Sequence, residues 1–335
     1  MKEIGGYFEL EQLISNEYHK NLVPLNTGRN ALIYLIKARG IKKLYIPYFL
    51  CGVVRDSLIK NNYAFEYYSI DNNFMPVFHK ELGNNEYLYV VNYYGQLTND
   101  KVIYLKQQYG QVIIDNTQGF FQKPVKGVDT IYSCRKFFGV PDGAYLSTDV
   151  QIKEDLERDV SKDRMTHILG RYEGTGAEYY RDYKNNTEAF KSEPLKSMSK
   201  LTHNILGAID YERTCEIRNK NYSYLESKLG TYNKLKLKTP IGPFAYPFHI
   251  ENGIEIRKEL AKKKIYVPLL WPNVLSDAPE ISIEYNYAAN ILPLPCDQRY
   301  GAADMEYIEE ELRRFESGSE CFNISCRISE CNKHI

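Results

Sequence analysis

The 335-residue chain lacks an excess of charge of either sign, a long apolar run and an apolar segment near its first residue. It has 43 basic and 43 acidic residues, and this balance argues against a general nucleic-acid binder, which needs a basic surface for phosphates. The apolar run over residues 31–36 is far shorter than the roughly 20 residues of a membrane helix. Residues 1–7 lack the apolar core of a secretory signal, so we expect a cytoplasmic protein with no membrane or nucleic-acid partner.

The seven cysteines and six histidines lack the spacing of metal and redox sites. No C-x-x-C pair is present, and the cluster of Cys321, Cys326, Cys331 and His334 in the tail fits no zinc pattern. We therefore expect reduced thiols and no metal site.

The sequence also lacks the phosphate loop G-x-x-x-x-G-K-[ST], the metalloprotease pattern H-E-x-x-H and the nucleophile elbow G-x-S-x-G. A serine-nucleophile motif, S-x-x-K, is present at Ser133 and Lys136, but it also occurs over residues 57–60 and 197–200. Its companion elements S-D-N and K-T-G are missing, which argues against a penicillin-binding type of enzyme.

Short apolar segments alternate with helical patterns up to about residue 150. The segments end at Pro, Asp or Asn and are rich in aromatic and β-branched residues, as strands are. Such alternation predicts right-handed crossovers and an α/β fold with a mostly parallel central sheet flanked by helices. The predicted strands are 43–46, 64–68, 87–91, 111–114, 129–133 and 143–147, and the predicted helices are 29–39, 53–60 and 100–109.

The pattern changes after residue 150. Residues 151–230 read as helical, with one long helix over 201–229 that links two lobes. Beyond 239–243, the pattern predicts short strands, with apolar segments at 244–250, 265–267 and 291–294, and one closing helix over 302–315. We predict a large domain over 1–235 with an N-terminal arm (1–25), a smaller α+β domain over 236–316 and a disordered tail over 317–335.

Polar residues follow the ends of neighbouring predicted strands. Asp115 ends one strand, Gln118 follows it, and Ser133 and Lys136 lie at the end of the next strand. Ligands bind at the carboxyl ends of the strands in parallel sheets. A lysine that forms a Schiff base and a carboxylate that keeps a pyridine nitrogen protonated are the groups that pyridoxal 5'-phosphate (PLP) requires.

With these residues, the chain resembles the DegT/DnrJ/EryC1/StrS sugar aminotransferases, which are PLP-dependent transferases of fold type I. T-G-R-N-A-L at 27–32 is similar to the family's S-G-T-x-A-L phosphate turn, and V-N-Y-Y-G at 91–95 to its V-x-x-[FY]-G. I-D-N-T-Q at 114–118 is similar to E-D-A-A-Q. D-T-I-Y-S-C-R-K at 129–136, followed by P-D-G-A at 141–144, resembles its lysine segment and G-[DE]-G-G.

The resemblance implies a role for each matching position. Lys136 would hold PLP as an internal aldimine and move protons as the catalytic residue, Asp115 would pair with the pyridine nitrogen, and Gln118 would bind the ring's phenolic oxygen. The phosphate would bind at the amides of Gly28 and Arg29 at a helix start, helped by the hydroxyls of Thr27 and Ser133. The ring-stacking aromatic should lie within 48–51, where strict register places Cys51, so Tyr48 or Phe49 is taken as the candidate. Arg171, Trp271 and Arg299 are considered as substrate contacts.

The resemblance implies a homodimeric aminotransferase that moves an amino group from an amino acid, glutamate in most relatives, to a keto-sugar nucleotide. The spacing between Ser133 and Lys136 in this chain is shorter than in the family. The chain is therefore, as an alternative, a PLP enzyme with a different amine or acyl-transfer reaction. A second alternative is a non-catalytic homologue that acts as an interaction module. The 30 tyrosines suit an interaction surface, but a scaffold would not need Asp115, Gln118 and Lys136 together.

Overall fold

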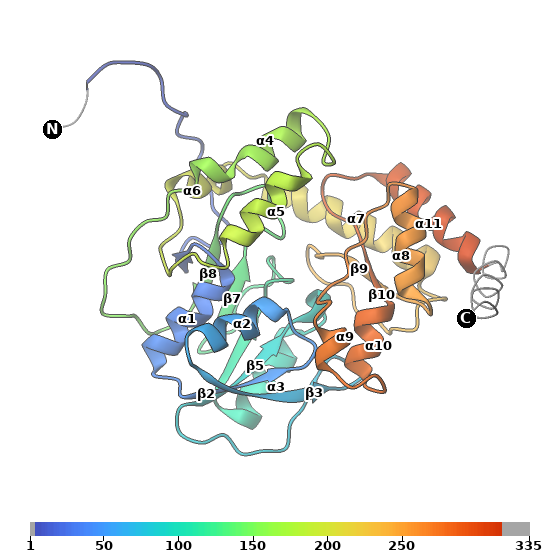
Figure 1. Cartoon of the computed structure of the whole chain (residues 1–335), viewed down its shortest axis with the longest axis horizontal. Helices are drawn as coiled ribbons and strands as arrows, with labels where there is room; N and C mark the ends of the chain where they lie inside the picture. The colour runs from blue at the N-terminus through green and yellow to red at the C-terminus, as the bar shows by residue number, and fades with distance from the viewer. Residues whose placement is uncertain (1–3, 317–335) are drawn as a thin grey trace, which may run out of the picture.

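A twisted eight-stranded sheet is the centre of the computed structural model, which describes residues 4–316 (Figure 1). Its strand order is β1-β8-β7-β6-β5-β2-β3-β4. The strands are β1 (Val23–Leu25), β2 (Lys43–Pro47), β3 (Ala64–Ile70), β4 (Pro76–Val77), β5 (Glu86–Val91), β6 (Val112–Asp115), β7 (Asp129–Ser133) and β8 (Ala144–Ser147). Strands β7, β6, β5, β2 and β3 are parallel, and β8 is antiparallel to both β7 and β1. The predicted α/β fold with a mostly parallel sheet is confirmed.

Three helices connect the first parallel strands as predicted: α1 (Gly28–Arg39), α2 (Gly52–Lys60) and α3 (Asn99–Tyr109). Thr27 begins α1, because its hydroxyl oxygen accepts a hydrogen bond from the Asn30 amide at 3.1 Å. Gly40 ends this helix in the left-handed conformation, with φ of 64°, which favours glycine. The chain therefore enters α1 at a fixed point directly after β1.

The sheet carries a core on each face near β7 and β8. Ile131 and Leu146 belong to the core that includes the buried side of α1. Their neighbours Tyr132 and Tyr145 point the other way and pack with Leu206, in a second cluster rich in aromatic rings. Burial on both faces explains why these strands are apolar at nearly every position.

The C-terminal part of the chain has its own core. It is built from the end of a long helix, a two-stranded antiparallel sheet and two further helices, and includes Tyr222, Phe248, Leu260 and Leu292. The elements of residues 148–316 are the 3-10 turn η2 (Lys162–Arg164), α4 (Thr166–Glu173), α5 (Tyr180–Ala189), α6 (Lys200–Gly207), α7 (Tyr211–Leu229), β9 (Tyr246–His249), α8 (Gly253–Lys262), α9 (Val274–Asp277), α10 (Ile283–Asn290), β10 (Ile291–Leu294) and α11 (Ala302–Glu316). The domain boundary at 235/236 stays a prediction.

The single helix predicted over 201–229 is wrong, because the chain breaks into α6 and α7. Asp210 starts α7 by accepting a hydrogen bond from the Arg213 amide at 3.0 Å, and the Tyr211 hydroxyl donates to the Leu206 carbonyl at 2.8 Å. The apolar periodicity continues across the break, so the pattern alone did not reveal it.

The prediction of short strands and one helix after residue 243 is also wrong in part. The segment 265–267 forms no strand, although Ile265 and Val267 are buried in the C-terminal core. Three helices, α8, α9 and α10, precede the predicted closing helix. Within residues 4–316, no helix is both long and apolar enough to cross a membrane. The predicted disordered tail, with Cys321, Cys326, Cys331 and His334, lies outside the described residues.

The end of the N-terminal arm is held against the aromatic cluster. The imidazole Nε2 of His19 donates to the Phe120 carbonyl at 2.8 Å, and the ring lies 4.3 Å from that of Tyr132, centre to centre. Burial lowers the pKa of His19 from 6.5 to about 4. The neutral imidazole is therefore the form that the folded state holds.

This burial should make the free energy of unfolding depend on pH. Since the pKa of His19 is lower in the folded than in the unfolded state, protons bind preferentially to the unfolded chain, and stability falls as pH drops from 6.5 towards 4. We expect His19 to contribute a loss of about 2 kcal/mol between pH 7.5 and pH 5. Urea unfolding at both pH values should show a smaller loss in H19Q than in the wild type. H79Q, which changes an exposed histidine, should retain the full loss; an unaltered loss in H19Q would refute the assignment.

Candidate functional site

The carboxyl ends of β1, β6 and β7 bring the predicted residues to one edge of the sheet. Asp115 is the last residue of β6 and Ser133 the last of β7, where it pairs with Ala144 of β8. Strand β1 runs in the same direction and ends just before Thr27, so the start of α1 lies at this edge as well. Open parallel sheets bind their ligands at such an edge.

Lys136 and Asp115 are connected through Thr117. The Lys136 amine donates to the Thr117 hydroxyl oxygen at 3.2 Å, and the Thr117 amide donates to Asp115 Oδ1 at 2.9 Å. Lys136 is exposed, and its amine also lies 5.8 Å from the ring centre of Phe244. The structure thus brings together an accessible amine and a buried carboxylate.

Asp115 is only 5% exposed and is held by two donors. Besides the Thr117 amide, the Tyr89 hydroxyl donates to Asp115 Oδ2 at 2.7 Å. Burial raises the pKa of Tyr89 well above its ordinary value, and the neighbouring Asp115 carboxylate raises it further. Tyr89 therefore remains a donor, while each carboxylate oxygen keeps a lone pair for another N–H group.

Gln118 has one bonded and one free end. Its Oε1 accepts from the Tyr94 amide at 2.7 Å, whereas its Nε2 is buried without a hydrogen-bond partner in the described part of the chain. The loop that supplies the Tyr94 amide requires Gly95, which has φ of 76° and would place a Cβ 2.8 Å from Pro240. The unpaired donor of Gln118 thus lies three residues after Asp115, and its role toward a cofactor stays a prediction.

The start of α1 lies beside Thr117. A Cβ on Gly28 would lie 3.5 Å from the Thr117 methyl carbon, so the helix begins in contact with the Lys136–Asp115 group. The Thr27 hydroxyl caps the helix, and Arg29 turns away to donate to the Phe190 carbonyl at 2.7 Å. Amides at the start of a helix can bind an anion, helped by the helix dipole.

The two aromatic candidates for ring stacking are packed against other aromatic rings. Tyr48 stacks on Tyr67, with ring centres 4.5 Å apart, and Phe49 is 1% exposed in the core against Trp271 at 4.6 Å. Trp271 thus packs in the core, and its role in binding a substrate stays a prediction. The role of Tyr48 or Phe49 in stacking stays a prediction.

The other substrate candidates occupy the surface. Arg299 forms an ion pair with Asp297 at 2.7 Å, and Arg171 is exposed on α4 beside Gly176. Nothing in these contacts links either residue to the Lys136 group, and their role in binding a substrate stays a prediction.

The loop after Lys136 is fixed from the C-terminal half of the chain. The Phe137 carbonyl accepts from Gln298 at 2.7 Å and from Arg218 at 3.2 Å. Arg218 is buried and also donates to the Pro243 carbonyl at 2.7 Å. These bonds hold the backbone that carries Lys136, so both residues position the lysine.

Four residues of this arrangement were given no role from the sequence: Tyr89, Thr117, Arg218 and Gln298. Tyr89 could have been found from the sheet register, because Val91 of β5 pairs with Asp115 of β6 and side chains alternate along a strand. Thr117 stands between two recognised positions but has no distinctive chemistry. Arg218 and Gln298 are distant in sequence, and no local pattern relates them to Lys136.

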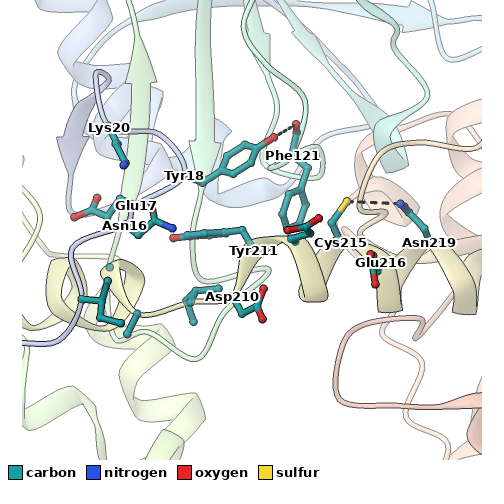
Figure 2. Close-up of a pocket in the computed structure, with 15 residues that line it drawn as sticks. Asn16, Glu17, Tyr18, Lys20, Phe121, Asp210, Tyr211, Cys215, Glu216 and Asn219 are labelled. Atoms are coloured by element: carbon teal, nitrogen blue, oxygen red, sulfur yellow. Dashed lines mark hydrogen bonds between the residues drawn. The ribbon is translucent and has the colours of Figure 1, made fainter.

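A separate hollow of about 830 Å³ lies between the N-terminal arm and the start of α7 (Figure 2). At its rim the Tyr18 hydroxyl donates to the Phe121 carbonyl at 2.9 Å, and Cys215 lies beside Asn219. Its lining carries the carboxylates of Glu17, Asp210, Glu212 and Glu216. The hollow shares no lining residue with the predicted cofactor site.

No protein-family model and no curated protein matches this sequence. Its structure is similar to that of NtdA from Bacillus subtilis with bound cofactor PMP, with a TM-score of 0.63 and 14% identity over 88% of this chain and 72% of NtdA. It is also similar to DesI in the presence of its TDP-sugar product, with a TM-score of 0.63 and 12% identity over 91% of this chain and 83% of DesI. A third match is the sugar aminotransferase CalS13 from Micromonospora echinospora, with a TM-score of 0.54 and 13% identity over 88% of this chain and 87% of CalS13. The chain therefore has the fold of these proteins, the type I fold of PLP-dependent transferases predicted from its sequence.

Proposed function

We propose that this protein is a PLP-dependent aminotransferase that moves an amino group from an amino acid, glutamate in this proposal, to a keto-sugar nucleotide. The observation that carries the proposal is the link from the Lys136 amine through Thr117 to the Asp115 carboxylate, at the ligand-binding edge of the sheet. A surface lysine and a strand-end aspartate without a shared function would not require this connection.

The residues present fit PLP. The buried Gln118 Nε2 has no partner within residues 4–316, and the phenolic oxygen of the cofactor would satisfy it. A free lone pair of the Asp115 carboxylate would accept a hydrogen bond from the protonated ring nitrogen. The amides at the start of α1 would bind the phosphate, together with the hydroxyls of Thr27 and Ser133.

When bound, PLP supplies an electron sink that stabilises negative charge on the substrate carbon. The chain's own residues then have separate tasks. The Lys136 amine would hold the cofactor and would serve as general base and acid, moving a proton to and from the substrate carbon. Asp115 would keep the ring nitrogen protonated, and Tyr89 donates to the carboxylate and fixes its position.

The substrate class is supported by the structural relatives. The structure of DesI was determined with its TDP-sugar product, that of NtdA with PMP, and CalS13 is a sugar aminotransferase. A nucleotide-linked keto sugar as amino acceptor, a homodimer and a cytoplasmic location are parts of the proposal.

Two half-reactions test this function. The purified protein with PLP and glutamate should release 2-oxoglutarate and leave PMP, and a nucleotide-linked keto sugar should convert PMP back to PLP, both followed by absorbance and mass spectrometry. A panel of amino acids and amines as donors serves as the comparison. The short spacing between Ser133 and Lys136 favours a different amine or acyl-transfer reaction as the second candidate. Bound PLP that never yields PMP with any donor would favour that candidate and contradict ours.

A further inference from the structure

The Tyr89 hydroxyl is bonded to a carboxylate, unlike the hydroxyls of four other buried tyrosines. Those of Tyr68, Tyr93, Tyr132 and Tyr211 donate to backbone carbonyls. Tyr89 instead donates to Asp115 Oδ2 at 2.7 Å, and the two side chains are only 2% and 5% exposed. A backbone carbonyl would satisfy a buried hydroxyl equally well, so burial alone does not explain why the acceptor is a carboxylate.

Tyr89 is fixed at the centre of the sheet. Its strand, β5, lies between β2 and β6, and its backbone carbonyl accepts a hydrogen bond from the Tyr68 hydroxyl at 2.8 Å. Tyr89 pairs with Ile113, and Val91 pairs with Asp115, so Tyr89 and Asp115 project from the same face of neighbouring strands. The hydroxyl therefore cannot turn to another acceptor unless the packed core around it is rearranged.

Neutral groups hold the Asp115 carboxylate within residues 4–316, namely the Tyr89 hydroxyl at Oδ2 and the Thr117 amide at Oδ1. The Lys136 amine reaches Asp115 only through the Thr117 hydroxyl, and in the proposed function this amine binds the cofactor. A buried carboxylate is unfavourable unless a cation joins it. A protonated ring nitrogen is such a cation, and each carboxylate oxygen retains a lone pair for it.

The carboxylate that accepts from Tyr89 is thus the one that would accept from the ring nitrogen. A hydrogen bond to the ionised form of a carboxyl group favours that form over the protonated one. A proton shared between Asp115 and the ring nitrogen is then held on the nitrogen. Tyr89 keeps its own proton, because burial raises its pKa well above the ordinary value and the Asp115 carboxylate raises it further.

We propose that the Tyr89 hydroxyl, through its bond to Asp115 Oδ2, keeps the ring nitrogen of PLP protonated and so sets the strength of the electron sink. Tyr89 is a positioning residue in this scheme, since it acts on the cofactor only through Asp115. The inference rests on the proposed function, in which Asp115 pairs with that nitrogen.

NMR of PLP that carries ¹⁵N in its ring tests the proposal directly, because the chemical shift distinguishes a protonated from a neutral ring nitrogen. The wild type and Y89F should be compared with Y132F, which removes the hydroxyl of another fully buried tyrosine, bonded to the Gln122 carbonyl at 2.9 Å. We expect a protonated ring in the wild type and in Y132F, and a shift towards the neutral ring in Y89F. D115N provides the reference for a ring that lacks its carboxylate.

The rate of PMP formation from PLP and glutamate should fall by about 10- to 100-fold in Y89F, the range for one hydrogen bond to a charged group. The loss should appear in kcat, while KM for glutamate changes little, because the bond acts on the ring and not on the amino donor. Y132F should retain both constants. Urea unfolding should show reduced stability in both variants, since each loses one buried hydrogen bond, so stability alone would not separate them.

A wild-type chemical shift in folded Y89F would overturn the inference, even with a lower rate, because Tyr89 would then act only on the placement of Asp115. Equal changes of chemical shift in Y89F and Y132F would also contradict it. A wild type that forms no borohydride-reducible adduct with PLP would refute the proposed function and this inference with it. A trapped adduct with an unchanged shift in Y89F would refute the inference alone.

Discussion

Replacing Lys136 with alanine should lower the rate of amino transfer by at least about 10³-fold, because one amine both binds the cofactor and moves the proton. The side chain is exposed and donates only to Thr117 among the hydrogen bonds found, so its removal leaves no buried group unpaired. The rate is measured as PMP formation from PLP and glutamate. Borohydride should attach the cofactor covalently to the wild type at Lys136, as read by mass spectrometry.

The control for this variant is K220A, which removes an exposed lysine from α7 and should retain wild-type rates and labelling. K136A should still bind PLP non-covalently, because the amides of α1 and the Asp115 carboxylate remain. Labelling of K136A by borohydride at the wild-type level would assign the amine to another residue.

Replacing Asp115 with asparagine should reduce amino transfer by about 10²- to 10³-fold, the usual effect of removing one preorganised electrostatic group from an active site. Asparagine retains the size of the side chain and an oxygen for the Thr117 amide, but it lacks the charge that favours a protonated ring nitrogen. The rate constant for PMP formation at saturating PLP is the measurement, and the absorbance spectrum of bound PLP should change with it.

D129N is the matched control for this charge. Asp129 and Asp115 are both 5% exposed, yet Asp129 lies at the other end of its strand and pairs with Arg39 at 2.9 Å. D129N should therefore lower the free energy of unfolding while the rate of the folded enzyme changes little. Equal rate losses in D115N and D129N would mean that Asp115 acts only through stability.

The parallel sheet could be predicted because its strands are short apolar runs with clear ends. Residues 43–46, 87–91 and 129–133 match β2, β5 and β7 to within one residue at each end. Pro47, Asn92 and the turn after Ser133 stop these runs, and burial on both faces requires an apolar side chain at nearly every position.

Other elements depend on contacts that a local pattern does not contain. β1 has only three residues, one of them proline, and exists because β8 lies beside it. The break between α6 and α7 follows from the cap by Asp210, inside a continuous apolar periodicity. Segment 265–267 is buried as irregular chain, and its apolar residues alone could not distinguish a strand from a packed loop.

The candidate site shows the same division. Asp115 and Lys136 were singled out because they end neighbouring strands and suit one chemistry, and the structure connects them. Thr117 was not singled out, because a threonine has no distinctive role until its contacts are known. Tyr89 resembles any tyrosine of a buried strand in sequence, and the pairing of β5 with β6 brings its hydroxyl to Asp115.

Strand β1 pairs with residues that are synthesised much later, and this pairing determines when the start of α1 can form. Val23 pairs with Leu146, and Leu25 bridges to Ser197, so a strand near the beginning of the chain waits for residues made far later. Contacts between such distant residues close large loops and slow folding. During synthesis, the turn at Thr27 and Gly28 would therefore stay unassembled until about two hundred residues have left the ribosome, and shorter fragments would not acquire it.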